Sequence, residues 1–277
     1  MPELPEVESV RRQLAPELTG RRVRDVTWDA SPSARISDLD LLPGRRIEAV
    51  HRRGKFLLCP LDPTPDGDPL ELVLHLGMTG SLSFTTTGGD TDPLPHVRVR
   101  IDLDDGRTLR FRDPRRFGRA SVVPAGDYVD RIPTLATLGP EPLSPAFDPG
   151  GFAAALAATS APVKAKLLDQ RLVAGVGNIY ADEALWRARI HPASRRVGRR
   201  RAAALHGAIV EVLTSAIERE GTTFRDYRMV NGASGRNATH LLAYGQADRP
   251  CQRCGEPLRR TVIAQRGTTF CARCQRH

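Results

Sequence analysis

Apolar and polar residues alternate strictly along 97–103, which is typical of a half-buried β-strand. The dipeptide Asp105-Gly106 that follows predicts a tight hairpin turn. Further strand-like stretches cover 46–60, 70–84 and 119–123, and an amphipathic helical stripe covers 3–19. The first half of the chain is therefore predicted to be mainly β, a sandwich or barrel with one helix packed on it.

Beyond residue 150 the apolar residues recur at the spacing of helices instead of strands. The helices expected from this period are 151–158, 163–169, 178–189 and 199–219. A proline-rich stretch, 134–150, separates the two patterns and predicts a linker. Residues 221–248 are rich in Gly, Asn and Thr and lack a period, so a mobile loop is expected there. The chain is thus predicted to be α+β, with segments 1–133, 134–150, 151–220, 221–248 and 249–277.

The charge of the chain indicates a polyanionic partner. Lys and Arg outnumber Asp and Glu by 41 to 32, which gives a net charge of +9. Basic proteins gain affinity for nucleic acids through counterion release, although a solvated arginine-rich surface has the same composition. No apolar stretch approaches the roughly 20 residues of a membrane span, and the first ten residues do not resemble a signal peptide. We expect a cytoplasmic protein with no membrane partner, and a monomer.

Four of the five cysteines form the pattern Cys251-x2-Cys254-x16-Cys271-x2-Cys274. Two close pairs at this separation predict one tetrahedral zinc ion, and four cysteine ligands leave no open position for catalysis. A disulfide framework is disfavoured without a secretion signal. Between the pairs we expect a β-hairpin whose turn, 265–267, carries Arg266. Many zinc-binding hairpins of this kind bind only protein, but an arginine at the tip of the hairpin favours nucleic acid as the partner.

The first residues after Met1, Pro2-Glu3-Leu4-Pro5-Glu6, support two interpretations. Proline and acidic residues are favoured in the first turn of any helix. Alternatively, removal of Met1 leaves Pro2 with a free secondary amine, which can attack a sugar carbon and form an iminium as lysine does in Schiff bases. An α-amine has an ordinary pKa of about 8, so a useful fraction is unprotonated at neutral pH.

Together with six further blocks in order, this opening resembles the formamidopyrimidine-DNA glycosylase family. The blocks are Arg52-Arg53-Gly54-Lys55-Phe56, His75-Leu76-Gly77-Met78-Thr79-Gly80, Asp113-Pro114-Arg115-Arg116-Phe117-Gly118, Leu138-Gly139-Pro140-Glu141-Pro142-Leu143, Gly175-Val176-Gly177-Asn178-Ile179-Tyr180 and the four-cysteine segment. The resemblance implies a catalytic N-terminal β-sandwich with a packed helix, a helix–two-turn–helix DNA-binding domain at 151–220, a lesion-covering loop at 221–248, and a zinc finger at 249–277.

The resemblance also assigns the residues that act at the deoxyribose. Pro2 matches the family nucleophile, and Glu3 matches the acid that assists proton transfer. Lys55 matches a β-hairpin lysine that contacts DNA near the lesion, and Arg266 matches the finger arginine that grips the phosphates around the flipped nucleotide. Glu6 matches an acid that lines the site.

The remaining matched positions are DNA contacts. His75 and Asn178 match phosphate ligands, and Lys164 matches a DNA-facing lysine. Taken alone, His75 would be a packed strand-end histidine and Asn178 a helix N-cap. Met78, Arg115 and Phe117 match the trio that fills the space left by the flipped base; alone, the two apolar members would belong to the core.

The resemblance implies a bifunctional DNA glycosylase and AP lyase that removes oxidised purines (formamidopyrimidines and 8-oxoguanine) from damaged duplex DNA by β,δ-elimination. Two alternatives remain. An endonuclease VIII-like glycosylase would remove oxidised pyrimidines, although Leu4 and the loop 221–248 favour the purine branch. A non-catalytic zinc-finger protein would bind DNA without cleaving it. The sequence lacks the glycine loops of ATP and NAD sites, so no nucleotide cofactor is expected.

Overall fold

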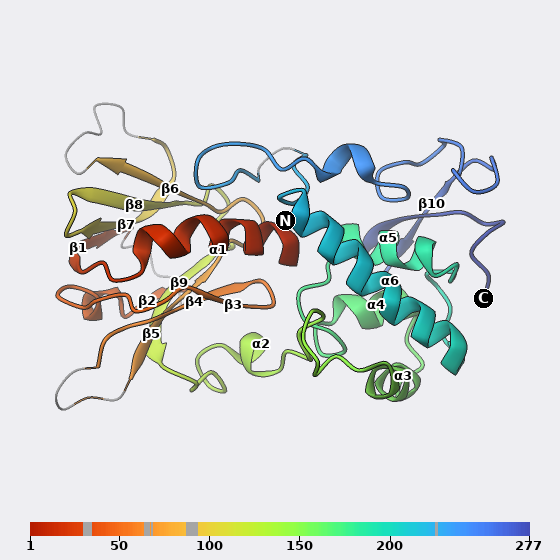
Figure 1. Ribbon diagram of the computed structural model, residues 1–277, viewed down its shortest axis with the longest axis horizontal. Coiled ribbons are helices and arrows are strands. Elements are labelled where there is room, and N and C mark those ends of the chain that lie inside the picture. Colours follow the sequence, from red (N-terminus) through yellow and green to blue (C-terminus); the bar gives the residue numbers. More distant parts are fainter. Residues whose placement is uncertain (30–34, 64–66, 68, 87–93, 225–226) are drawn as a thin grey trace. The chain divides into compact units, whose positions relative to one another are not determined.

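The computed structural model describes residues 1–277 except 30–34, 64–66, 68, 87–93 and 225–226. The chain forms two compact units (Figure 1). The first joins Met1–Ala136 to Glu220–Arg236, and the second joins Thr137–Arg219 to Asn237–His277. The segment expected as one loop, 221–248, is thus shared between the units. No helix in the described part of the chain is long and apolar enough to cross a membrane.

The first unit is built on two β-sheets. The five-stranded sheet has the order β2-β9-β5-β4-β3, and the four-stranded sheet has the order β1-β7-β8-β6. The strands are β1 (Val23–Trp28), β2 (Ile36–Ser37), β3 (His51–Arg53), β4 (Phe56–Pro60), β5 (Leu70–His75), β6 (Ser81–Thr86), β7 (Val97–Leu103), β8 (Arg107–Arg112) and β9 (Arg119–Pro124). Both sheets contribute to one apolar core. Two short helices, η1 (Leu39–Leu41) and α2 (Pro133–Ala136), complete the unit.

The sequence pattern and the strands agree closely at β7, whose bounds are those of the alternating stretch. The predicted runs 46–60 and 70–84 each contain two strands instead of one. Gly54 and Gly77 interrupt them with positive φ angles of 56° and 60°, a conformation that favours glycine. Predicted site residues lie beside both of these turns.

Helix α1 (Leu4–Leu18) lies against strands of the first unit (Figure 1), and its apolar stripe belongs to the same core. Val7, Val10, Leu14 and Leu18 are at most 1% exposed, so the period read from the sequence is confirmed. The helix begins with a reciprocal capping box between Glu3 and Glu6. Such a box satisfies amides that the first turn leaves without helical partners.

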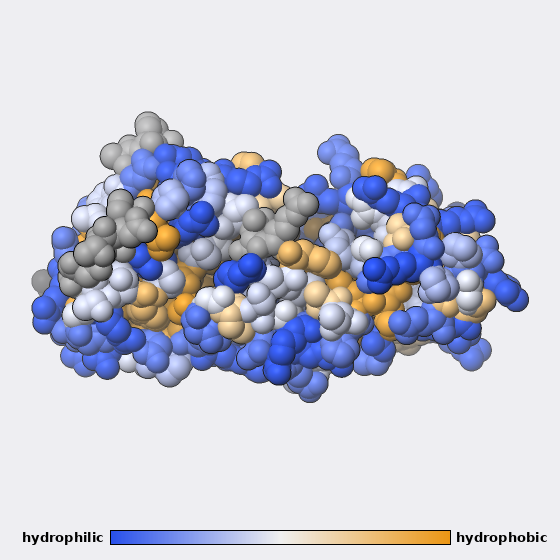
Figure 2. All heavy atoms as spheres, turned by 90° about the horizontal axis from the view of Figure 1, so that it is seen from above, coloured by the Kyte–Doolittle hydropathy of each residue, from blue (hydrophilic) through white to orange (hydrophobic). Residues whose placement is uncertain are grey.

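The second unit is mainly helical. Its helices are α3 (Pro149–Ala157), α4 (Val163–Leu168), α5 (Asn178–Arg187), α6 (Arg199–Glu218) and the 3₁₀ helix η2 (Asn237–His240). Helix α6 packs against α3 and α5, and α5 also contacts α4 and the C-terminal hairpin. Seen from above, the surface is mostly hydrophilic with small apolar patches (Figure 2).

The hairpin of the second unit consists of β10 (Arg259–Ile263) and β11 (Arg266–Phe270), in antiparallel register. Its two-residue turn is Ala264-Gln265, and both residues have positive φ, 49° and 58°. The turn predicted at 265–267 was therefore wrong in position: Arg266 is the first residue of β11. The prediction failed because a turn with two left-handed residues usually contains Gly or Asn, whereas this turn consists of Ala and Gln.

Candidate functional site

Pro2 and the two acidic residues after it form a buried cluster at the start of α1. Pro2 is buried, whereas Met1 before it is 52% exposed. The side chains of Glu3 and Glu6 are 2% and 1% exposed. The backbone N–H of Glu3 donates to Oε2 of Glu6 at 2.7 Å, and the Glu3 carboxylate accepts the backbone N–H of Glu6 in return. The capping box therefore fixes the backbone that directly follows Pro2.

Glu6 also holds a distant segment of the same unit. Its Oε1 accepts the backbone N–H of Thr222 at 2.7 Å. Gly221 has a φ of +81°, and a Cβ there would lie 2.8 Å from Oε1 of Glu6, so only glycine fits. The hydroxyl of Tyr227 donates to the carbonyl of Glu6 at 3.2 Å. Segment 220–236 is thus bound to the first turn of α1 through residues that the periodicity of the sequence does not single out.

Lys55 and His75 lie at adjacent turns of the five-stranded sheet. Lys55 occupies the β3–β4 turn, and the next residue, Phe56, pairs with His75 across β4 and β5. The Lys55 side chain is 7% exposed, and His75 is half-buried with its ring 4.6 Å from that of Phe56. The pairing places two expected DNA contacts at one end of the sheet.

His75 is neutral and presents a single N–H. Burial, together with the positive charges of Lys55, Arg119 and Arg35, lowers the pKa of His75 to about 4. The backbone N–H of Gly77 donates to Nδ1 at 3.1 Å. Because Nδ1 accepts this bond, the ring proton lies on Nε2, which can donate to an anionic oxygen.

Met78 and Phe117 are exposed, at 38% and 44%, so the alternative that places them in the core is wrong. The guanidinium carbon of Arg115 lies 4.9 Å from the centre of the Phe117 ring. These three side chains therefore form a partly apolar, partly cationic edge that is open to a ligand.

Asp113 joins the two loops that carry this edge, a role that we did not predict. Its Oδ1 accepts the hydroxyl of Thr79 at 2.7 Å, and its Oδ2 accepts the backbone N–H of Gly118 at 2.7 Å. At Gly77, a Cβ would come within 2.6 Å of backbone atoms of Phe117, so the loops are in direct contact. The sequence offered one sign of this role, because Asp113 is the first residue of the family block that ends at Gly118.

In the second unit, Lys164 does not face solvent, and the expectation of a DNA-facing lysine is corrected. Its side chain is fully buried and its Nζ lies 2.6 Å from Oδ1 of Asp182. Nζ also donates to the hydroxyl of Thr268 at 2.8 Å and to the carbonyl of Gly267 at 3.1 Å. A buried ammonium needs such partners, and here they come from α5 and β11. Lys164 therefore positions the finger hairpin.

Asn178 supports the same hairpin residue. Its Nδ2 donates to the carbonyl of Gly267 at 3.1 Å, and its buried Oδ1 has no hydrogen-bond partner among the described residues. Asn178 is the first residue of α5 and Gly177 is the N-cap, so the N-cap interpretation was wrong. Arg266, directly before Gly267, is exposed at the hairpin tip. Two donors thus fix the backbone beside the fingertip arginine.

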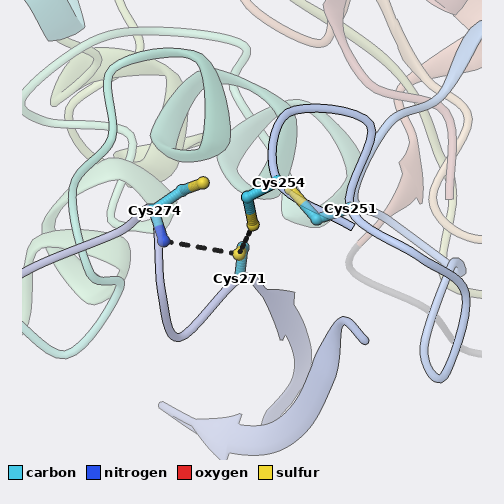
Figure 3. A group of neighbouring side chains, drawn as sticks. All are labelled: Cys251, Cys254, Cys271 and Cys274. Carbon is cyan, nitrogen blue, oxygen red and sulfur yellow. Dashed lines mark hydrogen bonds between the residues drawn. The ribbon is translucent and has the colours of Figure 1, made fainter. Parts of the chain in front are cut away.

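The four C-terminal cysteines converge as predicted (Figure 3). Their sulfur atoms all lie within 4.8 Å of one another, and Sγ of Cys254 is 3.5 Å from Sγ of Cys271. Four sulfurs around one zinc at about 2.3 Å would be roughly 3.8 Å apart, so the cluster fits a tetrahedral zinc ion. Two sulfurs come from the turn 251–254 and two from the segment that follows β11.

Comparison with protein families covers nearly the whole chain. The N-terminal domain of formamidopyrimidine-DNA glycosylase matches residues 1–120, its helix–two-turn–helix domain matches 138–228, and a zinc finger found in these enzymes and in isoleucyl-tRNA synthetases matches 249–276. The chain belongs to the formamidopyrimidine-DNA glycosylase family. The predicted α+β architecture and the one structural zinc ion are confirmed with it.

Individual relatives agree in length and in fold. The formamidopyrimidine-DNA glycosylase of Thermus thermophilus is 49% identical over 99% of this chain and 98% of its own, and that of Deinococcus radiodurans is 45% identical over 99% and 97%. The crystal structure of the Thermus thermophilus MutM (Fpg) protein covers 99% of this chain and 98% of its own, with 48% identity and a TM-score of 0.88. The wild-type Lactococcus lactis Fpg, solved with DNA that contains N7-benzyl-Fapy-dG, covers all of both chains with 32% identity and a TM-score of 0.87.

Within this glycosylase family fold, the expected site residues divide between the two units. Pro2, Glu3 and Glu6 lie in the first unit. The other expected contacts of that unit are Lys55, His75, Met78, Arg115 and Phe117, and those of the second unit are Lys164, Asn178 and Arg266.

Proposed function

We propose that the chain is a bifunctional DNA glycosylase and AP lyase that excises oxidised purines from damaged duplex DNA. The observation that carries this proposal is family membership over the whole chain together with the fixed position of Pro2, directly before a buried capping box. The DNA-bound structures of its relatives, and the net charge of +9, support duplex DNA as the substrate. DNA binding of this kind also supports association with the bacterial nucleoid.

In the first steps, removal of Met1 leaves Pro2 with an amine. The amine nitrogen attacks C1′ of the damaged nucleotide, the N-glycosidic bond breaks, and the base leaves with a proton. The sugar ring then opens: the C1′–O4′ bond breaks, O4′ takes up a proton, and C1′ and the Pro2 nitrogen form an iminium, which makes the C2′ proton acidic. Loss of that proton expels the 3′ phosphate, and a second elimination expels the 5′ phosphate, so a one-nucleotide gap with two phosphate ends remains. Glu3, which follows Pro2 directly, is proposed to transfer protons at the sugar.

The base must leave the helix before this attack, and extrusion costs a few kcal/mol. Met78, Phe117 and Arg115 are proposed to fill the space that the base vacates, which offsets the lost stacking. Their exposure and the ring–guanidinium contact support this role.

Both units are proposed to contribute phosphate contacts. Lys55 and the Nε2–H of His75 act from the first unit, and Asn178 and Arg266 from the second. A neutral histidine donor is suited to a phosphate oxygen because it binds without taking a proton from it. The zinc ion, when bound, fixes the base of the hairpin that carries Arg266.

Borohydride trapping tests the proposal. The zinc-loaded protein is incubated with duplexes that contain 8-oxoguanine or thymine glycol, in the presence of borohydride, and the products are resolved by mass. We expect a covalent protein–DNA adduct on the 8-oxoguanine duplex and little on the thymine glycol duplex. Preferential trapping on thymine glycol would assign the chain to pyrimidine repair, and binding without any adduct would leave a DNA-binding protein that lacks activity.

A further inference from the structure

An open cavity of about 810 Å³ lies beside the zinc centre, within the second unit. Its charged lining consists of guanidinium groups, the ring of His277 also lines it, and no Asp or Glu does. The five arginines come from the turn that follows α5, the first turn of α6 and the C-terminal cysteine segments; they are Arg189, Arg201, Arg253, Arg273 and Arg276. A repeated feature builds part of this wall, because an arginine directly precedes the second cysteine of each pair.

Two of these arginines are fixed by the protein itself. Arg253 donates to the carbonyls of Trp186 and Arg187 at the end of α5, and its guanidinium carbon lies 3.8 Å from the centre of the Trp186 ring. Arg201 donates to the carbonyl of Arg276 at 2.5 Å. These contacts give one side of the cavity a defined geometry.

The other three guanidiniums, those of Arg189, Arg273 and Arg276, have no hydrogen bond or ion pair with any residue that the structure describes. All three residues are exposed. Arg187, which lies nearby in sequence, shows the contrast, because it pairs with Glu211 at 2.6 Å. Like charges gathered without a carboxylate repel one another, so the arrangement favours an anion from outside the unit.

Neutralisation of the zinc centre explains only part of the positive charge. Four thiolates and one Zn²⁺ carry a net charge of −2. The five arginines carry +5, which leaves an excess of +3 on the side chains that line the cavity. The unpaired arginines therefore exceed what the metal site requires.

We propose that this cavity is a second phosphate-binding site, separate from the fingertip. Guanidinium groups bind phosphate oxygens through paired, charge-assisted hydrogen bonds. The volume lies within the range of ligand pockets and can hold several linked phosphates. Arg266 begins β11 and Cys271 follows its end, so the fingertip and the cavity are separated by roughly 16 Å along the strand. One phosphate cannot contact both. The phosphates belong either to DNA backbone remote from the lesion or to a soluble polyphosphate.

Inorganic tripolyphosphate is a direct probe of the site. Its binding to the full-length, zinc-loaded protein is measured by calorimetry at low salt. The triple variant Arg189→Gln/Arg273→Gln/Arg276→Gln removes the unpaired charges without breaking a side-chain contact that holds the fold. The matched control, Arg196→Gln/Arg199→Gln/Arg200→Gln, removes the same charge from exposed arginines of the same unit outside the cavity.

We expect saturable binding that weakens on the order of tenfold or more in the cavity variant and less than about twofold in the control. Unchanged zinc content and borohydride trapping would show that the variant is folded and that the proposed activity is a separate property. Absence of saturable binding, or an equal loss in both variants, would overturn the site, since the second result indicates net charge alone.

Measuring the DNA affinity of the same two variants distinguishes the two sources of phosphate. If DNA backbone occupies the cavity, tripolyphosphate competes with a long undamaged duplex, and the cavity variant has a shallower dependence of affinity on salt than the control. If a soluble polyphosphate is the ligand, both variants keep equal DNA affinity while only the cavity variant loses tripolyphosphate. Either result supports the phosphate site.

Discussion

Thr222 donates its backbone N–H to the Glu6 carboxylate at 2.7 Å, although the two residues are 216 positions apart in the sequence. The same carboxylate accepts the N–H of Glu3 through its other oxygen. One buried side chain therefore determines both the start of α1, next to Pro2, and the position of segment 220–236.

Replacement of Glu6 with Gln should destabilise the protein by about 1 to 3 kcal/mol, because an amide offers one acceptor where two N–H donors are buried. The free energy of unfolding measures this effect. The lyase rate should also fall, since the residue after Pro2 loses its fixed position. Glu17→Gln is the control: the Glu17 side chain is 46% exposed and pairs with Arg107, so its loss should cost less than about 1 kcal/mol. Equal effects of the two substitutions would contradict a special role for Glu6.

A free amine on Pro2 is required for the proposed attack. Mass spectrometry of active protein should show that Met1 is absent, and Pro2→Gly should retain part of the trapping because it still ends in an amine. Protein that retains Met1 should give no adduct, since an acylated nitrogen has no available lone pair. Full lyase activity with Met1 in place would falsify the assignment.

Glu3→Gln should prevent base release while DNA affinity stays nearly unchanged.

Removal of zinc should unfold the finger hairpin. Structural zinc contributes on the order of 10 kcal/mol to small fingers, so chelation or Cys254→Ser should abolish hydrogen-exchange protection in β10 and β11 and weaken DNA binding. Cys59→Ala should keep one zinc per chain, because Cys59 lies in the core of the other unit. Metal analysis that finds no zinc in active protein would contradict this prediction.

The pKa of His75 predicts an acid-sensitive contribution to stability. Between about pH 6.5 and 4 the unfolded chain binds a proton at His75 and the folded chain does not, so stability falls as the pH falls through this window. The contribution is about 2 to 3 kcal/mol, and it should be absent in His75→Asn, which keeps an acceptor near the Gly77 N–H but cannot be protonated. Denaturant unfolding at pH 7 and pH 4.5 compares the two proteins. Equal losses in both would show that other groups cause the acid sensitivity.

Arg266→Ala should weaken binding to damaged and undamaged duplexes alike. It should also make the slope of log K against log salt shallower by about 0.9, the value for one phosphate contact. Arg259→Ala, at the opposite end of the hairpin, is the control. If Arg266→Ala keeps the salt dependence of the unmodified protein, Arg266 contacts no phosphate.

Phe117→Ala should leave the slope of log K against log salt unchanged and slow excision on the order of tenfold, because the space that the flipped base vacates in the stack is no longer filled.

The periodic elements could be predicted from the sequence because burial imposes their spacing. The alternation at 97–103 gave β7 with its bounds, and the stripe at 199–219 gave α6 within one residue of its end. The zinc site was also predictable, since two short cysteine pairs need only a hairpin to bring them together.

Features that depend on distant partners could not be predicted in this way. The sequence near Lys164 does not show that Asp182 and Thr268 will bury its ammonium. The turn at Ala264-Gln265 departs from the usual turn composition, so the register of the hairpin was misplaced. Segment 220–236 has no period, and its place in the first unit depends on single hydrogen bonds such as that between Thr222 and Glu6 and on two apolar side chains, those of Tyr227 and Met229.

The return of segment 220–236 to the first unit has a consequence for synthesis on the ribosome. Tyr227 and Met229 belong to the apolar core of that unit, together with residues of α1 and both sheets. The core made by residues 1–136 therefore stays incomplete until residues 137–219, which hold helices α3 to α6 of the second unit, have been translated. A truncated chain that ends before residue 220 would expose the apolar surface that Tyr227 and Met229 cover, and we expect such a fragment to aggregate instead of folding by itself.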